Sequence, residues 1–311
     1  MRRLAGVMAL SIVLSQGISG QRETTVTTAN RTQVVLLGTG TPRPEPARSG
    51  PATAIVVNDA AYLVDAGPGV VRRAAAAYEK GITALAVDRL LTAFITHLHS
   101  DHTVGIPDLI FTTWVQGRRA PLKMYGPEGL AAMTRHVMLA WQADIDIRTK
   151  GLEHRRTAGL RVDAHDVKPG GVVYKDANVT VTAFQNAHGE FKQTFGYRLQ
   201  TPDRSIVISG DTNPSAALVE QCQKCDVLIH EVFSEDYRPA DMPNWLEYRS
   251  KYHTTTTELA EIANRTQPGL LILHHRGIGP RGREISDEQY LAEIRRTYAG
   301  KVVVGNDLDV Y

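Results

Sequence analysis

The sequence predicts a single α/β domain rich in strands, in which two similar halves form mixed sheets with helices outside. Short apolar runs of strand length alternate with helical patterns, and no long linker separates them. No internal repeat of fixed period and no low-complexity run interrupts the alternation. A length of 311 residues allows one large domain or two ordinary ones, and the continuous pattern favours one domain over residues 33–311.

Composition and charge describe a globular protein. Hydrophobic residues make up 42% and charged residues 22%, which is too apolar for a disordered chain. The formal net charge is only +2, so the chain lacks the basic excess of a dedicated nucleic-acid binder. Two cysteines are too few for a disulfide framework, whereas 11 histidines, several of them in one short run, are more informative.

The N-terminus has the pattern of a secretory signal peptide. A basic start at Arg2 and Arg3 precedes an apolar stretch of 11 residues at 4–14, well short of the roughly 20 that span a bilayer. We expect residues 1–20 to be a signal peptide and residues 21–32 a loose arm, with no membrane span in the mature chain. The mature protein is then periplasmic or secreted. A frayed apolar tail or a membrane-held N-terminus is the alternative.

The first half of the domain begins with strands. Short runs of β-branched and apolar residues, bounded by turn or polar residues, predict four strands. These strands cover residues 33–37, 52–58, 61–64 and 89–96. An alanine-rich segment with a proline near its first turn predicts a helix at 68–78. Apolar residues that recur on one helical face predict a second helix at 127–141.

The second half returns to strand patterns. Seven strands are expected at 172–174, 179–184, 195–199, 206–209, 227–229, 270–273 and 302–304. Two helices among the later strands are expected to begin at capping boxes, one formed by Thr255 with Glu258 and one by Ser286 with Gln289.

A histidine-rich run carries the strongest chemical signal. Residues 95–102 read I-T-H-L-H-S-D-H and directly follow an apolar strand. This run contains His97, His99, Asp101 and His102. At a strand end the backbone leaves the sheet, so successive side chains can turn toward one point. Imidazole and carboxylate groups are the ligands that Zn²⁺ and related ions prefer, and the spacing favours a metal site over a chance cluster of solvated histidines.

Four further candidate groups lie at wide spacing, at strand ends or before a helix. They are His188, Asp211, His253 and His275. Each alone has an ordinary alternative as a loop residue or a helix cap. Strand ends gather at one edge of an α/β sheet, which is where sites form in such folds. We therefore expect these side chains to approach the histidine run.

Together these residues resemble the metallo-β-lactamase superfamily, in the branch that contains ribonuclease Z and its arylsulfatase and phosphodiesterase relatives. The resemblance covers nearly all of residues 33–311. It rests on L-G-T-G-T-P at 37–42, V-D-A-G at 64–67, the H-x-H-x-D-H run, S-G-D-T at 209–212, I-H-E at 229–231, H-T-T at 253–255 and L-H-H at 273–275. It implies an αββα sandwich, two mixed β-sheets flanked by helices, with the site on one edge between the sheets.

The resemblance implies two metal ions held by seven side chains. The first ion would be bound by His97, His99 and His188, the second by Asp101, His102 and His275, with Asp211 bridging both. The ligand histidine of the family falls two residues after the last apolar residue of its strand, here Leu273, which favours His275 and leaves His274 as the alternative. Two Zn²⁺ ions are expected, and Mn²⁺ or Fe²⁺ also suits these ligands.

The resemblance also implies catalytic roles for Asp101, His253 and Glu231. Two divalent ions hold a shared water and lower its pKa, and the resulting hydroxide attacks phosphorus, sulfur or a carbonyl carbon. Asp101 lies where it would orient that water, and His253, held by Glu231, would protonate the leaving group. His230 is expected to be structural.

The expected function is that of an exported binuclear zinc hydrolase that cleaves phosphate diesters or aryl sulfate esters. The alternatives are a ribonuclease Z that processes tRNA 3′ ends, and a lactone or β-lactam hydrolase. The motifs fit ribonuclease Z, but the signal peptide points outward and no long Gly/Pro-rich arm for tRNA is evident. A metal-binding protein without activity is disfavoured because all seven ligands are present. The expected partner is a small anionic ester rather than a nucleic acid. Dimers are common among such relatives, so a homodimer is an expected state.

Weaker signals surround these motifs. Arg276 is a candidate contact for an anionic substrate, with a surface arginine as the alternative. A wall of apolar aromatic residues is a further candidate for substrate binding, although core packing is favoured for its two tryptophans. These residues are Phe111, Trp114, Tyr237, Trp245 and Tyr252. The basic segment 148–161 is read as a solvated face. Cys222 and Cys225 are expected to form a surface disulfide or to be free thiols, because a second zinc site lacks partners.

Overall fold

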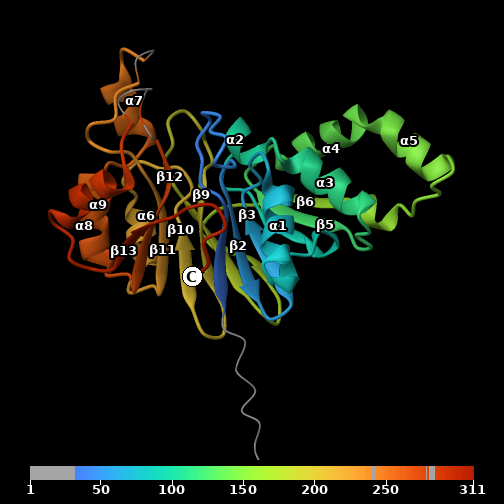
Figure 1. Cartoon of the computed structure of the whole chain (residues 1–311), viewed down its shortest axis with the longest axis horizontal. Helices are drawn as coiled ribbons and strands as arrows, with labels where there is room; N and C mark the ends of the chain where they lie inside the picture. Colours follow the sequence, from blue (N-terminus) through green and yellow to red (C-terminus); the bar gives the residue numbers. More distant parts are fainter. Residues whose placement is uncertain (1–31, 240–241, 278, 280–283) are drawn as a thin grey trace, which may run out of the picture.

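The computed structural model describes residues 32–239, 242–277, 279 and 284–311. In this part of the chain, two β-sheets pack face to face and helices cover their outer sides (Figure 1). The predicted sandwich of two mixed sheets flanked by helices is therefore confirmed. The predicted signal peptide and nearly all of the N-terminal arm lie outside the described residues.

The first sheet is built from the N-terminal half. Its strands, in spatial order, are β1 (Gln33–Gly38), β2 (Ala52–Val57), β3 (Ala60–Val64), β4 (Thr92–Phe94), β5 (Leu122–Gly126) and β6 (Val162–Asp166). The neighbours β1, β2 and β3 pair antiparallel, and each strand from β3 to β6 pairs parallel with the next. The helices of this half are α1 (Val70–Glu79), α2 (Ser100–Thr103), α3 (Ile106–Val115), α4 (Leu130–Ala140) and α5 (Gln142–Lys150).

The second sheet is built from the C-terminal half. Its strands, in spatial order, are β13 (Val302–Val304), β12 (Leu270–Arg276), β11 (Val227–Val232), β10 (Ser205–Ile208), β9 (Phe195–Gln200), β8 (Thr180–Gln185) and β7 (Gly171–Lys175). The pairs from β10 to β13 are parallel, and those from β7 to β10 are antiparallel. The helices are α6 (Ala216–Gln221), α7 (Trp245–Tyr252), α8 (Thr256–Thr266) and α9 (Asp287–Arg295).

Alternating side chains divide the interior into three apolar layers. In β1, Val35 and Leu37 pack with α1 and α3, while Val34 and Leu36 face the second sheet. The layer between the sheets contains Phe94, whose ring lies 5.6 Å from that of Tyr197 across the interface. The third layer joins the second sheet to α6, α8 and α9. Because successive side chains of a strand point to opposite faces, each sheet packs against the other sheet on one face and against helices on the other.

Several predicted elements differ from the observed ones. The strand expected at 89–96 shrinks to β4, because residues 87–89 form a 3-10 turn and the chain leaves the sheet after Phe94. The sequence patterns predict neither helices α2, α3, α5 and α7 nor strands β5 and β6. The capping box of Thr255 and Glu258 is present at α8. Ser286 caps α9 as expected, but the Gln289 side chain donates to Asp236 and Glu293 instead of returning to the cap.

The sheets bring several loops to one edge. Because β10, β11 and β12 are parallel, their C-terminal ends lie at one edge of the second sheet. The segment after β4 of the first sheet meets the same edge, where the Thr96 carbonyl accepts the Phe195 N–H, and α2 and α7 also lie there (Figure 1). None of the helices in the described ranges combines the length and apolar character that a membrane span requires.

Candidate metal centre

The seven predicted ligands meet at this edge. They are His97, His99, Asp101, His102, His188, Asp211 and His275. Six of them are buried, and only His99 is partly exposed. Six of them form two sets, which we call the first group (His97, His99 and His188) and the second group (Asp101, His102 and His275).

The first group is a compact cluster of imidazole nitrogens. The Nε2 atoms of His97 and His188 lie 3.0 and 3.1 Å from Nδ1 of His99. Four ligands about 2.0–2.1 Å from a tetrahedral zinc ion are separated from one another by about 3.3 Å. The first group therefore has the size of one face of such a site.

The second group combines a carboxylate with two imidazoles. Nε2 of His275 lies 3.1 Å from Oδ2 of Asp101, and Nε2 of His102 lies 3.5 Å from the same oxygen. These three atoms also surround a space that would hold one metal ion. Unlike the first group, they offer one oxygen ligand and two nitrogen ligands.

Asp211 lies between the two groups. Its Oδ1 is 3.4 Å from Nε2 of His102, and its Oδ2 is 3.6 Å from Nε2 of His275 and 4.0 Å from Nε2 of His188. The backbone turns sharply before it at Gly210, where φ is +62° and an added Cβ would lie 2.8 Å from the Phe195 carbonyl oxygen. Glycine is required there, and the turn directs Asp211 toward both groups.

Unpaired polar atoms show that the cluster fits cations. Nε2 of His102 and Oδ1 of Asp211 are fully buried, and neither makes a hydrogen bond within the described part of the chain. A buried polar atom without a partner is unfavourable, and divalent cations satisfy such lone pairs. The donor set of five imidazoles and two carboxylates suits zinc and related ions.

A β-bulge separates His275 from His274. Along β12, His274 pairs with Glu231 and Arg276 with Val232, so His275 is the extra residue, with φ +45°. The bulge brings His275 to the second group, while Nε2 of His274 lies 2.9 Å from the Gly38 carbonyl oxygen on the first sheet. Of the two histidines left open by the sequence, His275 is therefore the one at the centre.

Hydrogen bonds around the ligands fix the orientation of their rings. Nδ1 of His102 lies 2.8 Å from Oδ2 of Asp65, whose other oxygen accepts the Thr96 backbone N–H at 2.8 Å. Nδ1 of His188 donates to the Tyr252 carbonyl at 2.7 Å. Such outer contacts orient ligand histidines and select their tautomers. Sequence reasoning assigned no role to Asp65, although it lies in the V-D-A-G motif.

Burial and charge set the protonation of the ligands. Burial lowers the pKa of His97 well below its ordinary value and that of His188 to about 3, which leaves both rings neutral and able to bind a cation. Burial also acts to lower the pKa of His102, but the carboxylates of Asp211 and Asp65 outweigh it and raise that pKa. The second group therefore carries the stronger negative field.

The predicted Glu231–His253 pair is present beside the centre. A β-bridge between Phe233 and Thr255 brings the two segments together, and Nδ1 of His253 lies 3.3 Å from Oε1 of Glu231. The same oxygen accepts the backbone N–H groups of Thr212 and Thr254. A ring nitrogen of His253 also lies within 4.8 Å of ligand atoms of His188 and Asp211. Burial lowers the pKa of His253 to about 4.

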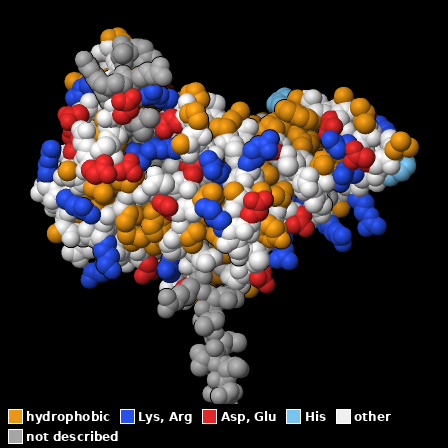
Figure 2. All heavy atoms as spheres, viewed as in Figure 1, with side chains coloured by type: hydrophobic (Ala, Val, Ile, Leu, Met, Phe, Trp, Pro, Cys, Tyr) orange, Lys and Arg blue, Asp and Glu red, His pale blue; other side chains and the backbone are white. Residues whose placement is uncertain are grey.

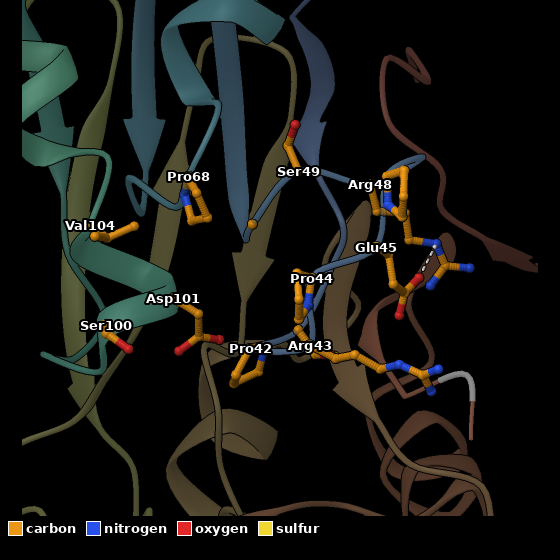
Figure 3. A pocket seen from close by; sticks show the side chains of 13 residues that line it. Pro42, Arg43, Pro44, Glu45, Arg48, Ser49, Pro68, Ser100, Asp101 and Val104 are labelled. Carbon is orange, nitrogen blue, oxygen red and sulfur yellow. Dashed lines mark ion pairs between the residues drawn. The ribbon is translucent and has the colours of Figure 1, made fainter. Parts of the chain in front are cut away.

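A cavity of about 460 Å³ opens at the Asp101 side of the centre. Figure 3 shows Asp101, from α2, beside Pro42 on the loop that follows β1. Prolines and Val104 form apolar walls, and an ion pair between Arg48 and Glu45 lies on one side. The cavity has the size of a small-molecule site.

Comparisons with known proteins agree with this geometry. Residues 61–276 match the family described as "Beta-lactamase superfamily domain". A protein named Ribonuclease Z from Mycobacterium bovis is 34% identical over 283 residues, which cover 89% of this chain and 96% of that protein. The chain belongs to the metallo-β-lactamase superfamily, in the ribonuclease Z branch. Ribonuclease Z from Mycobacterium sp. (strain KMS) is 36% identical over 247 residues, or 78% of this chain and 83% of that one.

Solved structures share the metallo-β-lactamase fold. The metallo-beta-lactamase fold protein YhfI from Bacillus subtilis has a TM-score of 0.66 at 18% identity, covering 91% of this chain and 100% of that chain. The short form of human tRNase Z also has a TM-score of 0.66, at 24% identity, covering 90% of this chain and 98% of that chain. Family membership and these relatives show that the chain is a metal-dependent hydrolase, and the histidines and aspartates at this edge could hold the divalent metal that the family implies.

Arg276 does not point to the metal centre of this family member. Its side chain is buried, its guanidinium lies 2.5 Å from Asp287, and it covers the ring of Tyr290 at 5.6 Å. This arrangement gives no support to the expected contact with an anionic substrate. The alternative of a surface arginine is wrong, since only 1% of the residue is exposed.

The other weak candidates take structural positions, with one exception. Phe111 stacks on Trp141, and Trp114 donates to the Arg156 carbonyl, both at the α5 end of the molecule. Tyr237 packs against Trp245, the first residue of α7, whereas the ring of Tyr252 lies 4.9 Å from that of the ligand His188.

The cysteines and the basic segment are also accounted for by the fold. Cys222 and Cys225 form a disulfide at the end of α6, and both are buried rather than on the surface as predicted. In the basic segment 148–161, Arg148 pairs with Asp144 and Glu153. Figure 2 shows acidic and basic side chains mixed at the α5 end of the molecule, as expected for a solvated face.

Replacing Asp211 with alanine should impair both metal positions, because its carboxylate approaches both groups. We expect about two ions per zinc-loaded native chain and at most one in the variant after dialysis, measured by elemental analysis. We expect zinc to raise the melting temperature of the native protein, and this rise should be lost in the variant. Asp59→Asn, in the exposed turn between β2 and β3, is the control and should keep both properties. Full metal content in Asp211→Ala would show that Asp211 does not bridge the two positions.

Proposed function

We propose that this chain is a binuclear zinc-dependent hydrolase of phosphate diesters. The observation that carries the proposal is the meeting of all seven ligands with the Glu231–His253 pair at one edge. Relatives named Ribonuclease Z, which match over most of their length, favour a phosphodiester over an aryl sulfate ester. The assignment of the chain as a metal-dependent hydrolase does not depend on which ester is the substrate.

Two substrate classes are candidates. Precursor tRNA, cut at its 3′ end, is favoured by the relatives named Ribonuclease Z. A small phosphodiester is the second candidate, because the cavity beside Asp101 has the volume of a small-molecule pocket and the N-terminal residues have the pattern of an export signal.

We assign different steps of the hydrolysis to different residues around the centre. Two bound divalent ions would supply an acidified water and neutralise charge on the phosphate oxygens. Asp101 both lines the cavity and joins the second group, so we assign it the orientation of the attacking water. His253 lies near His188 and Asp211 without being needed in either group, and Glu231 holds its Nδ1. Because burial lowers its pKa to about 4, His253 is neutral near pH 7, so we assign it the relay of a proton, released by the attacking water, to the leaving oxygen.

Assays of the zinc-loaded protein on several ester classes test the proposal. We expect hydrolysis of bis(p-nitrophenyl) phosphate, or 3′ cleavage of precursor tRNA, to exceed turnover of p-nitrophenyl sulfate, a β-lactam and a lactone. The Asp211→Ala variant provides the background rate for each substrate. A dominant rate on the sulfate, the β-lactam or the lactone, with no diester turnover, would contradict the proposal.

Replacing His253 with alanine should separate proton donation from metal binding. We expect both ions to remain and turnover to fall about 10²–10⁴-fold for a diester with a basic alkoxide leaving group. The loss should be much smaller for a nitrophenolate, which leaves without a proton.

His136→Ala, on the exposed face of α4, is the matched control and should leave rates and metal content unchanged. Equal losses on both leaving groups would mean that His253 positions the substrate instead. Loss of metal would make His253 a ligand.

We also propose that the chain is exported. The basic start and apolar stretch of residues 1–20 support this, and a disulfide between Cys222 and Cys225 suits an oxidising compartment. Mass spectrometry of natively produced protein should find a new N-terminus between residues 18 and 31, outside the cytoplasm. Such a result would favour the small phosphodiester. An intact Met1 in the cytosol would contradict export and would favour precursor tRNA.

A further inference from the structure

Three partly exposed aromatic side chains border the first group of ligands. Phe191 lies in the loop between β8 and β9, and Tyr248 and Tyr252 lie on α7. We call these three residues the aromatic rim. In Figure 1, α7 stands above the strand ends of the second sheet, at the edge that carries the metal centre. Of the three, only Tyr252 was singled out from the sequence.

Phe191 packs directly on the ligand rings. Its ring centroid lies 4.6 Å from that of His99, with the planes perpendicular, and 5.7 Å from that of His97. It lies nearly parallel to His188, at 6.1 Å. Because Phe191 is only half-buried, part of its ring remains accessible beside the metal centre.

The two tyrosines form a stacked pair on the same side of the centre. The ring of Tyr248 lies 4.2 Å from that of Tyr252, with 14° between the planes. Tyr252 in turn contacts His188 through both its ring and its carbonyl oxygen. A Cβ at Gly189 would lie 1.9 Å from Cζ of Tyr252, so only glycine lets α7 close on the ligand loop.

Tyr248 lies close to the charged groups of the metal centre. Its ring lies 5.6 Å from that of His253. Burial, with the carboxylates of Asp211 and Glu231, raises the pKa of Tyr248 to about 12. Like an ordinary tyrosine, Tyr248 is uncharged at physiological pH, and it places an uncharged ring with a protonated hydroxyl close to His253.

The two ends of the centre differ in character. The described residues that line the cavity at the Asp101 side are prolines, small residues and charged residues, and none is aromatic. The aromatic rim adjoins the first group, at the other end. A diester carries two substituents, and these two surroundings match one substituent each.

We propose that Phe191, Tyr248 and Tyr252 form a stacking subsite for a planar ring of the substrate, either an aryl group or a nucleobase. This inference rests on the proposed hydrolysis of phosphate diesters, because the ring would be attached to the phosphate held at the centre. Aromatic side chains favour stacked or edge-to-face contact with such rings, and stacking tolerates different ring types.

Binding of paired ligands to the zinc-loaded protein tests the subsite without requiring turnover. Phenylphosphonate and methylphosphonate differ by an aryl ring, and uridine 5′-monophosphate and ribose 5-phosphate differ by a base. By titration calorimetry, we expect the ring-bearing member of at least one pair to bind about 5- to 100-fold tighter, the range that one stacked ring supplies. The pair with the larger ratio identifies the source of the ring.

Variants of the rim should remove this preference. Phe191→Leu and Tyr248→Leu should each bring the ratio toward one with zinc content unchanged, while Phe191→Tyr should retain it. Tyr78→Leu, on the exposed side of α1, is the control and should behave as the native protein. A ratio near one in the native protein, a ratio unchanged in both leucine variants, or no binding of any of the four compounds would overturn the inference.

Failure of the subsite and failure of the proposed function give different results. If the ring preference is found and no diester is hydrolysed, the subsite stands and the function is wrong. If diesters are hydrolysed and the ring makes no difference to binding, the function stands and the aromatic rim is only a wall of the site.

Discussion

The rest of the site depends on the crowding of seven ionisable side chains at one desolvated edge of the sandwich. The carboxylates of Asp101 and Asp211 are buried there, and a nitrogen of His102 faces them without a hydrogen bond in the part of the chain described. Such an arrangement is unfavourable unless cations occupy it. The contacts of Asp65 and of the Tyr252 carbonyl fix the orientation of the His102 and His188 rings, as is typical of histidines that bind a metal ion.

Backbone features deliver the ligands to this point from widely separated segments. The turn at Gly210 and the bulge at His275 direct Asp211 and His275 toward the centre, in positions where regular strands would have continued the alternation of faces. On one side the centre opens into a cavity walled by prolines, and on the other α7 and Phe191 place aromatic rings against the first group. The charged cluster is therefore bordered by two chemically different surfaces, the cavity walled by prolines and the aromatic rim.

The sequence predicted the fold and the meeting of the candidate ligands at one edge, because both depend on local patterns. Strand periodicity and the H-x-H-x-D-H run are visible in a few residues, and strand ends must gather at one edge of a sheet. The role of Asp65 depends on His102, 37 residues away, so spacing alone could not reveal it. The partly exposed positions of Phe191 and Tyr248 follow from the docking of α7, a weakly amphipathic helix that no periodic pattern marked. Burial of the disulfide likewise follows from tertiary packing.

The central claim is that two cations are held by these seven side chains. Anomalous diffraction at the zinc absorption edge, from crystals of the zinc-loaded protein, tests it most directly. The account predicts two peaks, one about 2.0–2.1 Å from nitrogen atoms of His97, His99 and His188, and one in contact with Asp101, His102 and His275. The carboxylate of Asp211 should touch both. A single peak, or a peak bound by His274 or His253 in place of these ligands, would contradict the account.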